Sequence, residues 1–268
     1  AIQIMYDFKY HRATSIGDAQ STFKSSDDPV YLAGGMTLLP TMKLRLASPS
    51  DVIDIGQLDG LTGVERSGDE IVVKAMTTHS EVAASADVAT AIPALGSLAD
   101  SIGDPHVRNR GTIGGSIANN DPAADYPAAL VGLGSVVVTT SRKIGADGFF
   151  TNMFETALKP DELITAVRFR IPEAACYMKF PNPASRYALV GVMVARTDDG
   201  VRVAVTGAGP CVFRASEMET ALTADFKPEA IASIPMATDG LNSDIHASSE
   251  YRAHLVGVMA ARAVAACG

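Results

Sequence analysis

The sequence contains Ala33-Gly34-Gly35-Met36-Thr37-Leu38 at the end of an apolar run and, further along, Thr112-Ile113-Gly114-Gly115-Ser116 at the start of a polar stretch. Glycine lacks a Cβ and adopts positive φ freely, so a Gly-Gly step can bring backbone N–H groups close to phosphate oxygens. Two such loops can hold one pyrophosphate from both sides. The two glycine pairs therefore predict a bound dinucleotide.

The most familiar nucleotide-binding motifs are missing from the sequence. It contains no G-x-x-x-x-G-K-S/T, and Gly207-Ala208-Gly209-Pro210 lacks the third glycine of a G-x-G-x-x-G motif. The sequence thus supports neither a P-loop protein nor a Rossmann fold.

Composition excludes several classes of partner. The 268 residues are 47% hydrophobic, which is enough for a substantial core, and the formal net charge is −8. An acidic chain has no excess of cations to neutralise a nucleic acid or an anionic membrane. We expect no nucleic-acid partner.

The three cysteines, Cys176, Cys211 and Cys267, are widely spaced and form no C-x-x-C pair. This spacing argues against a metal site or an iron–sulfur cluster held by this chain, and a sparse, odd number is typical of a reducing compartment. No stretch has the apolar length of a membrane span, and residues 1–10 lack the apolar core of a signal peptide. We expect no integral membrane segment and a cytoplasmic location.

Strand and helix signals alternate along the first two thirds of the chain. Helix starts are predicted by Ser15 as an N-cap, by the Thr78/Glu81 capping box and by Pro93 in a first turn. Apolar runs and alternation predict strands at 30–33, 51–55, 71–73, 135–139 and 167–171, and residues 103–115 are expected to form a loop.

Pro172 ends the alternating strand before it and marks the expected domain boundary. Beyond it, residues 177–180, 187–195 and 201–208 predict an antiparallel meander with short turns, followed by a helix at 249–266.

Several blocks, in order, resemble one protein family. Residues 31–43 and 111–125 are similar to the two FAD-binding loops of the medium, flavin-carrying subunits of molybdenum hydroxylases, the xanthine dehydrogenase and aerobic carbon monoxide dehydrogenase family. Residues 177–190 resemble the start of that family's C-terminal domain, and 249–255 resemble its final helix. Within this family, the sequence is more similar to the carbon monoxide dehydrogenase-like branch than to the xanthine dehydrogenase-like branch.

The resemblance implies an α+β protein of three parts. These are two α/β subdomains of a vanillyl-alcohol-oxidase (PCMH)-type FAD-binding fold, at 1–55 and 56–172. A C-terminal domain at 173–268 would follow, with a three-stranded antiparallel sheet and helices.

The resemblance also implies how FAD is bound. The pyrophosphate would meet the backbone of both glycine loops and three hydroxyl groups, and the Asp125 carboxylate would accept from ribityl or ribose hydroxyls. Lys179 would lie near the isoalloxazine and favour the reduced, anionic flavin, while Tyr187 and Leu163 would contact the cofactor. The expected cofactor-binding residues are Leu32, Ala33, Gly34, Gly35, Met36, Thr37, Leu38, Thr112, Ile113, Gly114, Gly115, Ser116, Asp125, Leu163, Lys179 and Tyr187.

Simpler roles are open for several of these residues. Asp125 can cap a helix that starts at Tyr126, Lys179 can lie on a solvent-exposed strand face, and Tyr187 and Leu163 can be core residues. No catalytic role is assigned to His79, or to any other residue of this chain.

No nucleophile–base pair and no metal site is visible in the sequence, so we expect an electron-transfer subunit. The resemblance implies a large subunit with the molybdopterin cofactor and a small subunit with two iron–sulfur (2Fe–2S) clusters, in a dimer of heterotrimers. A quinone, NAD or oxygen would accept the electrons. The alternatives are a self-contained FAD-dependent oxidase or dehydrogenase and a non-catalytic assembly subunit. The substrate stays open among carbon monoxide, xanthine, aldehydes and heterocycles.

Overall fold

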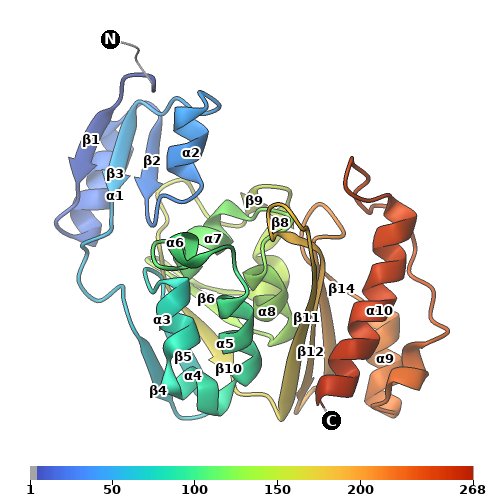
Figure 1. The fold of residues 1–268 in the computed structure, drawn as a ribbon. Coiled ribbons are helices and arrows are strands. Elements are labelled where there is room, and N and C mark those ends of the chain that lie inside the picture. Colours follow the sequence, from blue (N-terminus) through green and yellow to red (C-terminus); the bar gives the residue numbers. More distant parts are fainter. Residues whose placement is uncertain (1–4, 268) are drawn as a thin grey trace.

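The computed structural model describes residues 5–267 and arranges them in three units, each built around its own sheet (Figure 1). An N-terminal unit lies over a middle unit, and a C-terminal unit packs beside the middle one. Helices and sheets are mixed throughout, as expected for an α+β protein.

The N-terminal unit holds a parallel sheet in the order β1 (Lys9–Arg12), β3 (Asp51–Asp54), β2 (Pro29–Leu32), with helices α1 (Ile16–Ser25) and α2 (Leu38–Lys43). The Ser15 side chain caps α1 by accepting from the Asp18 amide at 3.0 Å, as predicted. β2 runs straight into the first glycine loop, which places that loop at the lower edge of this sheet, against the middle unit.

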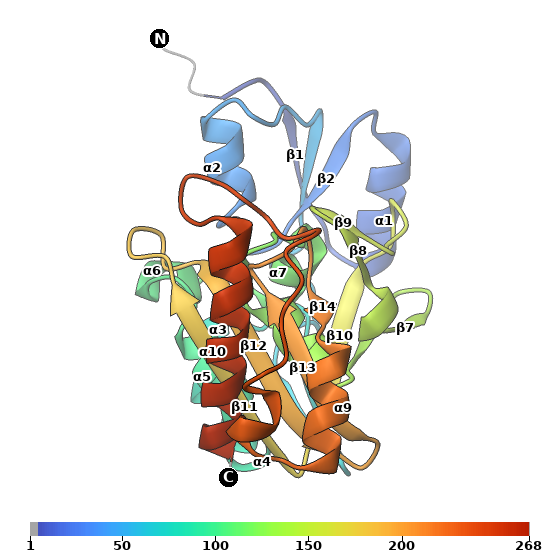
Figure 2. The same ribbon diagram turned by 90° about the vertical axis from the view of Figure 1, so that its right-hand side faces the viewer.

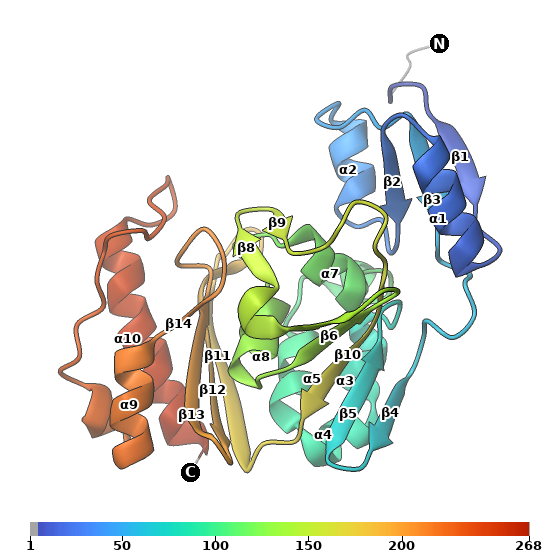
Figure 3. The same cartoon turned by 180° about the vertical axis from the view of Figure 1, so that it is seen from behind.

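The middle unit holds a five-stranded antiparallel sheet, ordered β4 (Val64–Ser67), β5 (Glu70–Lys74), β10 (Ile164–Arg170), β6 (Val136–Thr139), β7 (Lys143–Gly145). A small hairpin of β8 (Phe150–Asn152) and β9 (Glu155–Thr156) follows the 3₁₀ helix Ala146–Gly148. Helices α3 (His79–Ala84) and α5 (Pro93–Asp100) lie behind the sheet in Figure 3. The unit also contains α4 (Ala86–Ala91), α6 (Pro105–Arg108), α7 (Ile113–Asn119) and α8 (Tyr126–Gly132).

The predicted loop at 103–115 is wrong, because α6 and the start of α7 lie within it. Asp104 caps α6 by accepting from the Val107 amide at 2.9 Å, and Thr112 caps α7 by accepting from the Gly115 amide at 3.1 Å. Short polar N-cap residues are strong local signals for a helix start. The cap at Thr112 was missed because the glycines that follow it have low helix propensity. The Thr78/Glu81 capping box is present as predicted.

The C-terminal unit has an antiparallel sheet in the order β11 (Ala174–Pro181), β12 (Ala188–Thr197), β13 (Gly200–Thr206), β14 (Phe213–Arg214). Three strands were expected; the fourth has only two residues, too few to show a sequence pattern. Figure 2 shows α9 (Ser216–Ala224) and α10 (Ser249–Cys267) in front of this sheet, with a short 3₁₀ helix at Pro228–Ile231. The opposite face packs on α5 and α8 of the middle unit.

A buried arginine links α10 to the segment that follows α7. Arg252 is 4% exposed, and its guanidinium donates to the carbonyls of Leu189 and Gly207 at 2.8 and 2.9 Å and to Asp244 at 2.8 Å. The amide of Gly207 in turn donates to the Pro122 carbonyl at 2.8 Å, in the segment after α7. The last helix thereby supports a wall of the middle unit through two strands.

We expect Arg252→Leu to lower the free energy of unfolding by about 3 kcal/mol, because two buried carbonyls lose their donor, with a fall in Tm of roughly 6–12 °C. Thermal unfolding followed by circular dichroism measures this. Arg262→Leu, at an exposed position of the same helix, is the control. Equal melting temperatures for the two variants would contradict the role of Arg252.

Candidate functional site

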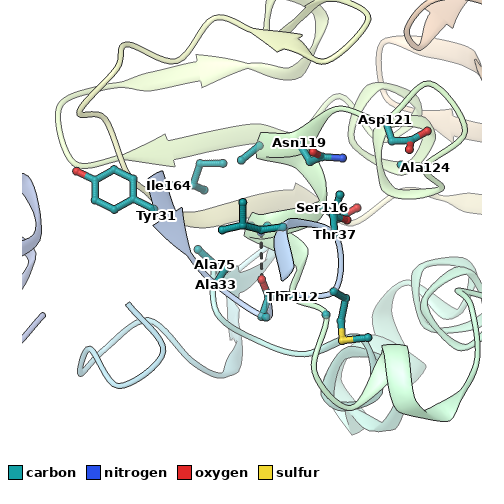
Figure 4. Close-up of a pocket in the computed structure, with 18 of the residues that line it drawn as sticks. Tyr31, Ala33, Thr37, Ala75, Thr112, Ser116, Asn119, Asp121, Ala124 and Ile164 are labelled. Atoms are coloured by element: carbon teal, nitrogen blue, oxygen red, sulfur yellow. Dashed lines mark hydrogen bonds between the residues drawn. The ribbon is translucent and has the colours of Figure 1, made fainter. Parts of the chain in front are cut away.

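A cavity of about 870 Å³ lies where the three units meet. Both glycine loops line it, together with Asp125, residues 158–164 and the segment 184–187. Figure 4 shows Tyr31 and Thr37 of the N-terminal unit and Thr112, Ser116, Asn119 and Asp121 of the middle unit around the same hollow. Its volume is in the range of cofactor sites.

The first glycine loop presents unused backbone donors. Within the described chain, the amides of residues 34–38 have no hydrogen-bond acceptor, whereas the next amide, that of Leu39, donates to the Gly35 carbonyl at 3.1 Å. Gly35 has φ +75°, a left-handed conformation that favours glycine. Consecutive unpaired amides around such a residue form a concave site for an anion.

The two loops touch each other, and glycine makes this possible. A Cβ on Gly34 would overlap the carbonyl of Arg110, and a Cβ on Gly115 would lie 3.4 Å from the Ala33 Cβ. Each pair thus allows the backbone of one unit to lie against the other.

The second loop differs from the first in its donors. The amides of Ile113 and Gly114 donate to the carbonyls of Thr77 and Ala75 at 3.1 and 2.8 Å, and those of Gly115 and Ser116 donate to Thr112. The backbone of residues 112–116 was expected to contact phosphate, but within the described chain only the Thr112 amide of this loop is without a hydrogen-bond acceptor. A Cβ on Gly114 would lie 2.7 Å from the Ala75 carbonyl oxygen, so this glycine serves packing.

Most of the expected cofactor-binding residues line the cavity. They are Ala33, Gly34, Gly35, Met36, Thr37, Leu38, Thr112, Gly114, Gly115, Ser116, Asp125, Leu163 and Tyr187. Three do not. Leu32 is the last residue of β2, Ile113 is buried in the middle core, and Lys179 bonds to Asp125, which does line the cavity.

Asp125 is the buried end of a polar cluster. Its carboxylate accepts from the Lys179 ammonium at 3.0 Å and from the Tyr177 hydroxyl at 2.5 Å, and Lys179 also donates to the Ser101 carbonyl at 3.3 Å. Burial raises the pKa of Asp125, while the charge of Lys179 and the Tyr177 bond oppose that rise.

Both simpler roles considered for this pair are wrong. In the described structure the Asp125 side chain makes no capping bond to α8, and the Lys179 side chain is only 9% exposed. Gly191, the cross-strand partner of Lys179, makes room for the cluster, because a Cβ there would overlap the Tyr177 hydroxyl.

Tyr187 and Leu163 both line the cavity but differ in exposure. Tyr187 is 46% exposed and belongs to the rim, so it is not a core residue. Its neighbour Arg186 has φ +63°, which is strained for a residue with a side chain. Leu163 is 4% exposed and is both a core residue and a lining residue.

Many lining residues were not named as site residues by the sequence reasoning, among them Asn119, Asp121 and Glu162. Glu162 accepts from Thr139, Ser141 and Arg142, and Arg142 holds its pKa well below the usual range. It fixes the wall that carries Leu163. Glu162 follows Asp161, and nothing in this acidic pair shows from sequence that the glutamate is buried.

His79 is another lining residue that was missed, and it is a neutral imidazole in the cavity wall. Burial, with a smaller effect of Arg108, lowers its pKa to about 4. Its amide donates to the Gly111 carbonyl at 3.0 Å, so the segment after β5 supports the second glycine loop.

Residues 5–267 contain no cluster of three His, Cys, Asp or Glu side chains that could bind a metal ion. None of the helices described for this chain is long and apolar enough to span a membrane.

Comparison with known proteins agrees with this geometry. Residues 6–174 match the family described as the FAD binding domain in molybdopterin dehydrogenase. The chain is 36% identical to the nicotine 6-hydroxylase medium subunit of Paenarthrobacter nicotinovorans, over 97% of each chain. It is 33% identical to the carbon monoxide dehydrogenase medium chain of Afipia carboxidovorans, over 96% of this chain and 95% of that one.

A solved structure of carbon monoxide dehydrogenase from Oligotropha carboxidovorans superposes with a TM-score of 0.93 and 31% identity, over 99% of both chains. Carbon monoxide dehydrogenase from Hydrogenophaga pseudoflava gives 0.91 and 33%, over 99% of this chain and 98% of that one. These matches confirm the resemblance carried by the two glycine loops: the chain belongs to the FAD-binding subunits of the molybdopterin dehydrogenases.

Proposed function

We propose that this chain is the FAD-carrying electron-transfer subunit of a multi-subunit molybdenum hydroxylase. The observation that carries the proposal is the row of unpaired amides at residues 34–38, which faces a cavity large enough for a dinucleotide. These donors fit a pyrophosphate, which carries negative charge and only accepts hydrogen bonds. FAD, when bound, would supply the redox chemistry, which the protein's own side chains do not.

The two glycine loops would bind the pyrophosphate in different ways. The first loop would donate its amides and the hydroxyl of Thr37 to the pyrophosphate. The second loop would contribute mainly side chains, because the amides of residues 113–116 are already used. Ser116 lines the cavity, and the Thr112 hydroxyl, which accepts from Gly115, keeps its own proton for a ligand.

The Asp125–Lys179 pair would orient and tune the cofactor. An ionised Asp125 accepts hydrogen bonds from ribityl or ribose hydroxyls, and Lys179 keeps it ionised. Lys179 lies beyond Asp125 from the cavity, so its positive charge would reach the isoalloxazine through this carboxylate rather than by contact. Leu163 and Tyr187 would supply apolar contacts from the wall and the rim.

The arrangement of sheets supports three domains in this chain, and the other cofactors would be bound by partner subunits. We infer a PCMH-type FAD-binding fold made of residues 1–55 and 56–172, with 173–268 as the C-terminal domain; both boundaries lie between strands of different sheets. A large subunit would hold the molybdopterin cofactor, and a small subunit would deliver electrons from 2Fe–2S clusters, in a dimer of heterotrimers. An external quinone, NAD or oxygen would take the electrons from this chain.

The substrate of the whole enzyme would be selected elsewhere. Relatives named for nicotine, carbon monoxide, glyceraldehyde and caffeine align with this chain over 96–97% of its length. A chain shared across such different substrates fits an electron-transfer role.

Native purification tests the proposal. We expect FAD close to one per chain, together with molybdenum, iron and two further polypeptides. FAD in a lone chain that oxidises an alcohol would support a self-contained oxidase instead. A colourless protein, which contains no flavin, would support a non-catalytic assembly subunit.

Met36→Glu should weaken FAD binding at least about tenfold, because it places a negative charge beside the proposed pyrophosphate site. Met36 is 36% exposed, so the fold should be retained. The control is Met36→Gln, because glutamine has the shape of glutamate without its charge. Its affinity for FAD should lie within about threefold of that of the parent protein. Fluorescence titration of the apoprotein measures both, and equal affinities for the two variants would argue against the first loop as the phosphate site.

Lys179→Met should make stability depend on pH. Without Lys179 the pKa of Asp125 in the folded state rises further above its unfolded value. The folded state then binds a proton more tightly than the unfolded state. Stability therefore falls as the pH rises through the folded-state pKa. We expect a loss of about 3 kcal/mol at pH 8 and clearly less at pH 5. Thermal unfolding at both pH values tests this. Adding Asp125→Asn should remove the difference, and parallel pH profiles for parent and single variant would refute the coupling.

A further inference from the structure

Two cysteines meet in the C-terminal unit, away from the cofactor cavity. β11 alternates its side chains: Cys176, Met178 and Phe180 pack in the layer shared with α10, while Tyr177 packs with the middle core. Cys267 lies in the last turn of α10. Figure 2 shows that end of α10 in front of the C-terminal sheet.

The strand register places the two cysteines close to each other. The Cys267 thiol lies 3.8 Å from the carbonyl oxygen of Val194, and Val194 is the direct cross-strand partner of Cys176. The Cys176 and Cys267 side chains also interact electrostatically with each other. Both cysteines are partly buried.

Their surroundings make one sulfur a nucleophile. The interaction with Cys267 lowers the pKa of Cys176 to about 7 against the opposing effect of burial, and the same interaction raises the pKa of Cys267. Burial alone raises the pKa of the third cysteine, Cys211. Since the thiolate is the reactive form, Cys176 should react with oxidants well before Cys211.

We propose that Cys176 and Cys267 form a reversible intramolecular disulfide when the protein meets a peroxide. The Cys176 thiolate attacks one peroxide oxygen and breaks the O–O bond, which gives a sulfenic acid and hydroxide. The Cys267 thiol then attacks that sulfur, loses its proton, and the sulfenic hydroxyl leaves as water. Two thiols are oxidised by two electrons, and hydrogen peroxide is reduced to two waters.

The bond would tie the last turn of α10 to β11. Tyr177, the residue after Cys176, holds Asp125 at the cavity through its hydroxyl. The same strand thus carries the thiol on one face and a support of the proposed cofactor site on the other.

The test is peroxide titration of the purified native protein, followed by denaturation, alkylation and mass spectrometry of this chain. The reduced chain has three alkylatable cysteines. We expect oxidation to leave one, with a loss of two hydrogen atoms, a linked peptide pair containing Cys176 and Cys267, and full recovery after a dithiol reductant. Oxidation of this pair should be about tenfold faster than any modification of Cys211.

Variants separate the pair from a general sensitivity to peroxide. Cys211→Ser should form the same linked peptide, whereas Cys267→Ser should stop at sulfenic acid on Cys176. Disulfides between chains, oxidation of Cys211 at a rate equal to that of Cys176, or sulfinic acid without a linked peptide in the parent protein would each overturn the proposal. The parent protein alone decides the matter if Cys267→Ser fails to fold.

Discussion

The contact between the two glycine loops is the constraint on which the rest of the molecule depends. The N-terminal unit reaches the middle unit where Gly34 meets Arg110 and Gly111, and where Ala33 meets Gly115. Side chains at these glycines would force the units apart and open the cavity between them. Because the amides of Ile113 and Gly114 donate to the carbonyls of Thr77 and Ala75, the second loop is held in place and can support the first loop.

The sequence predicted the elements that have local signals. The caps at Ser15 and Thr78 and the strand leading into Gly34 are present, since each depends only on neighbouring residues. The helix at Ile113 was missed, because its glycines lower helix propensity and are compensated by packing on Ala75, far away in the sequence. The two-residue β14 exists only through pairing with β13.

The site was predicted in the same uneven way. Glycine pairs and the residues beside them line the cavity, but whether an amide is unused depends on its long-range partner, as the bond from Gly114 to Ala75 shows. The burial of Lys179 likewise follows from Asp125, more than fifty positions away, and no alternation pattern along β11 could reveal it. Lys179 was predicted as a site residue only from the family resemblance, and the structure explains its position by the contact with Asp125.

Gly191 extends the cofactor region to a position that touches no ligand. Glycine weakens the interior of a strand, since it adds backbone entropy and offers no side chain to pack. Here it lies in β12, flanked by β11 and β13, where only a missing Cβ lets the Tyr177 hydroxyl reach Asp125. We therefore expect positions 177 and 191 to change together among related chains. A larger residue at 191 requires a shorter one at 177, and Asp125 must then find another donor or give way to a neutral side chain.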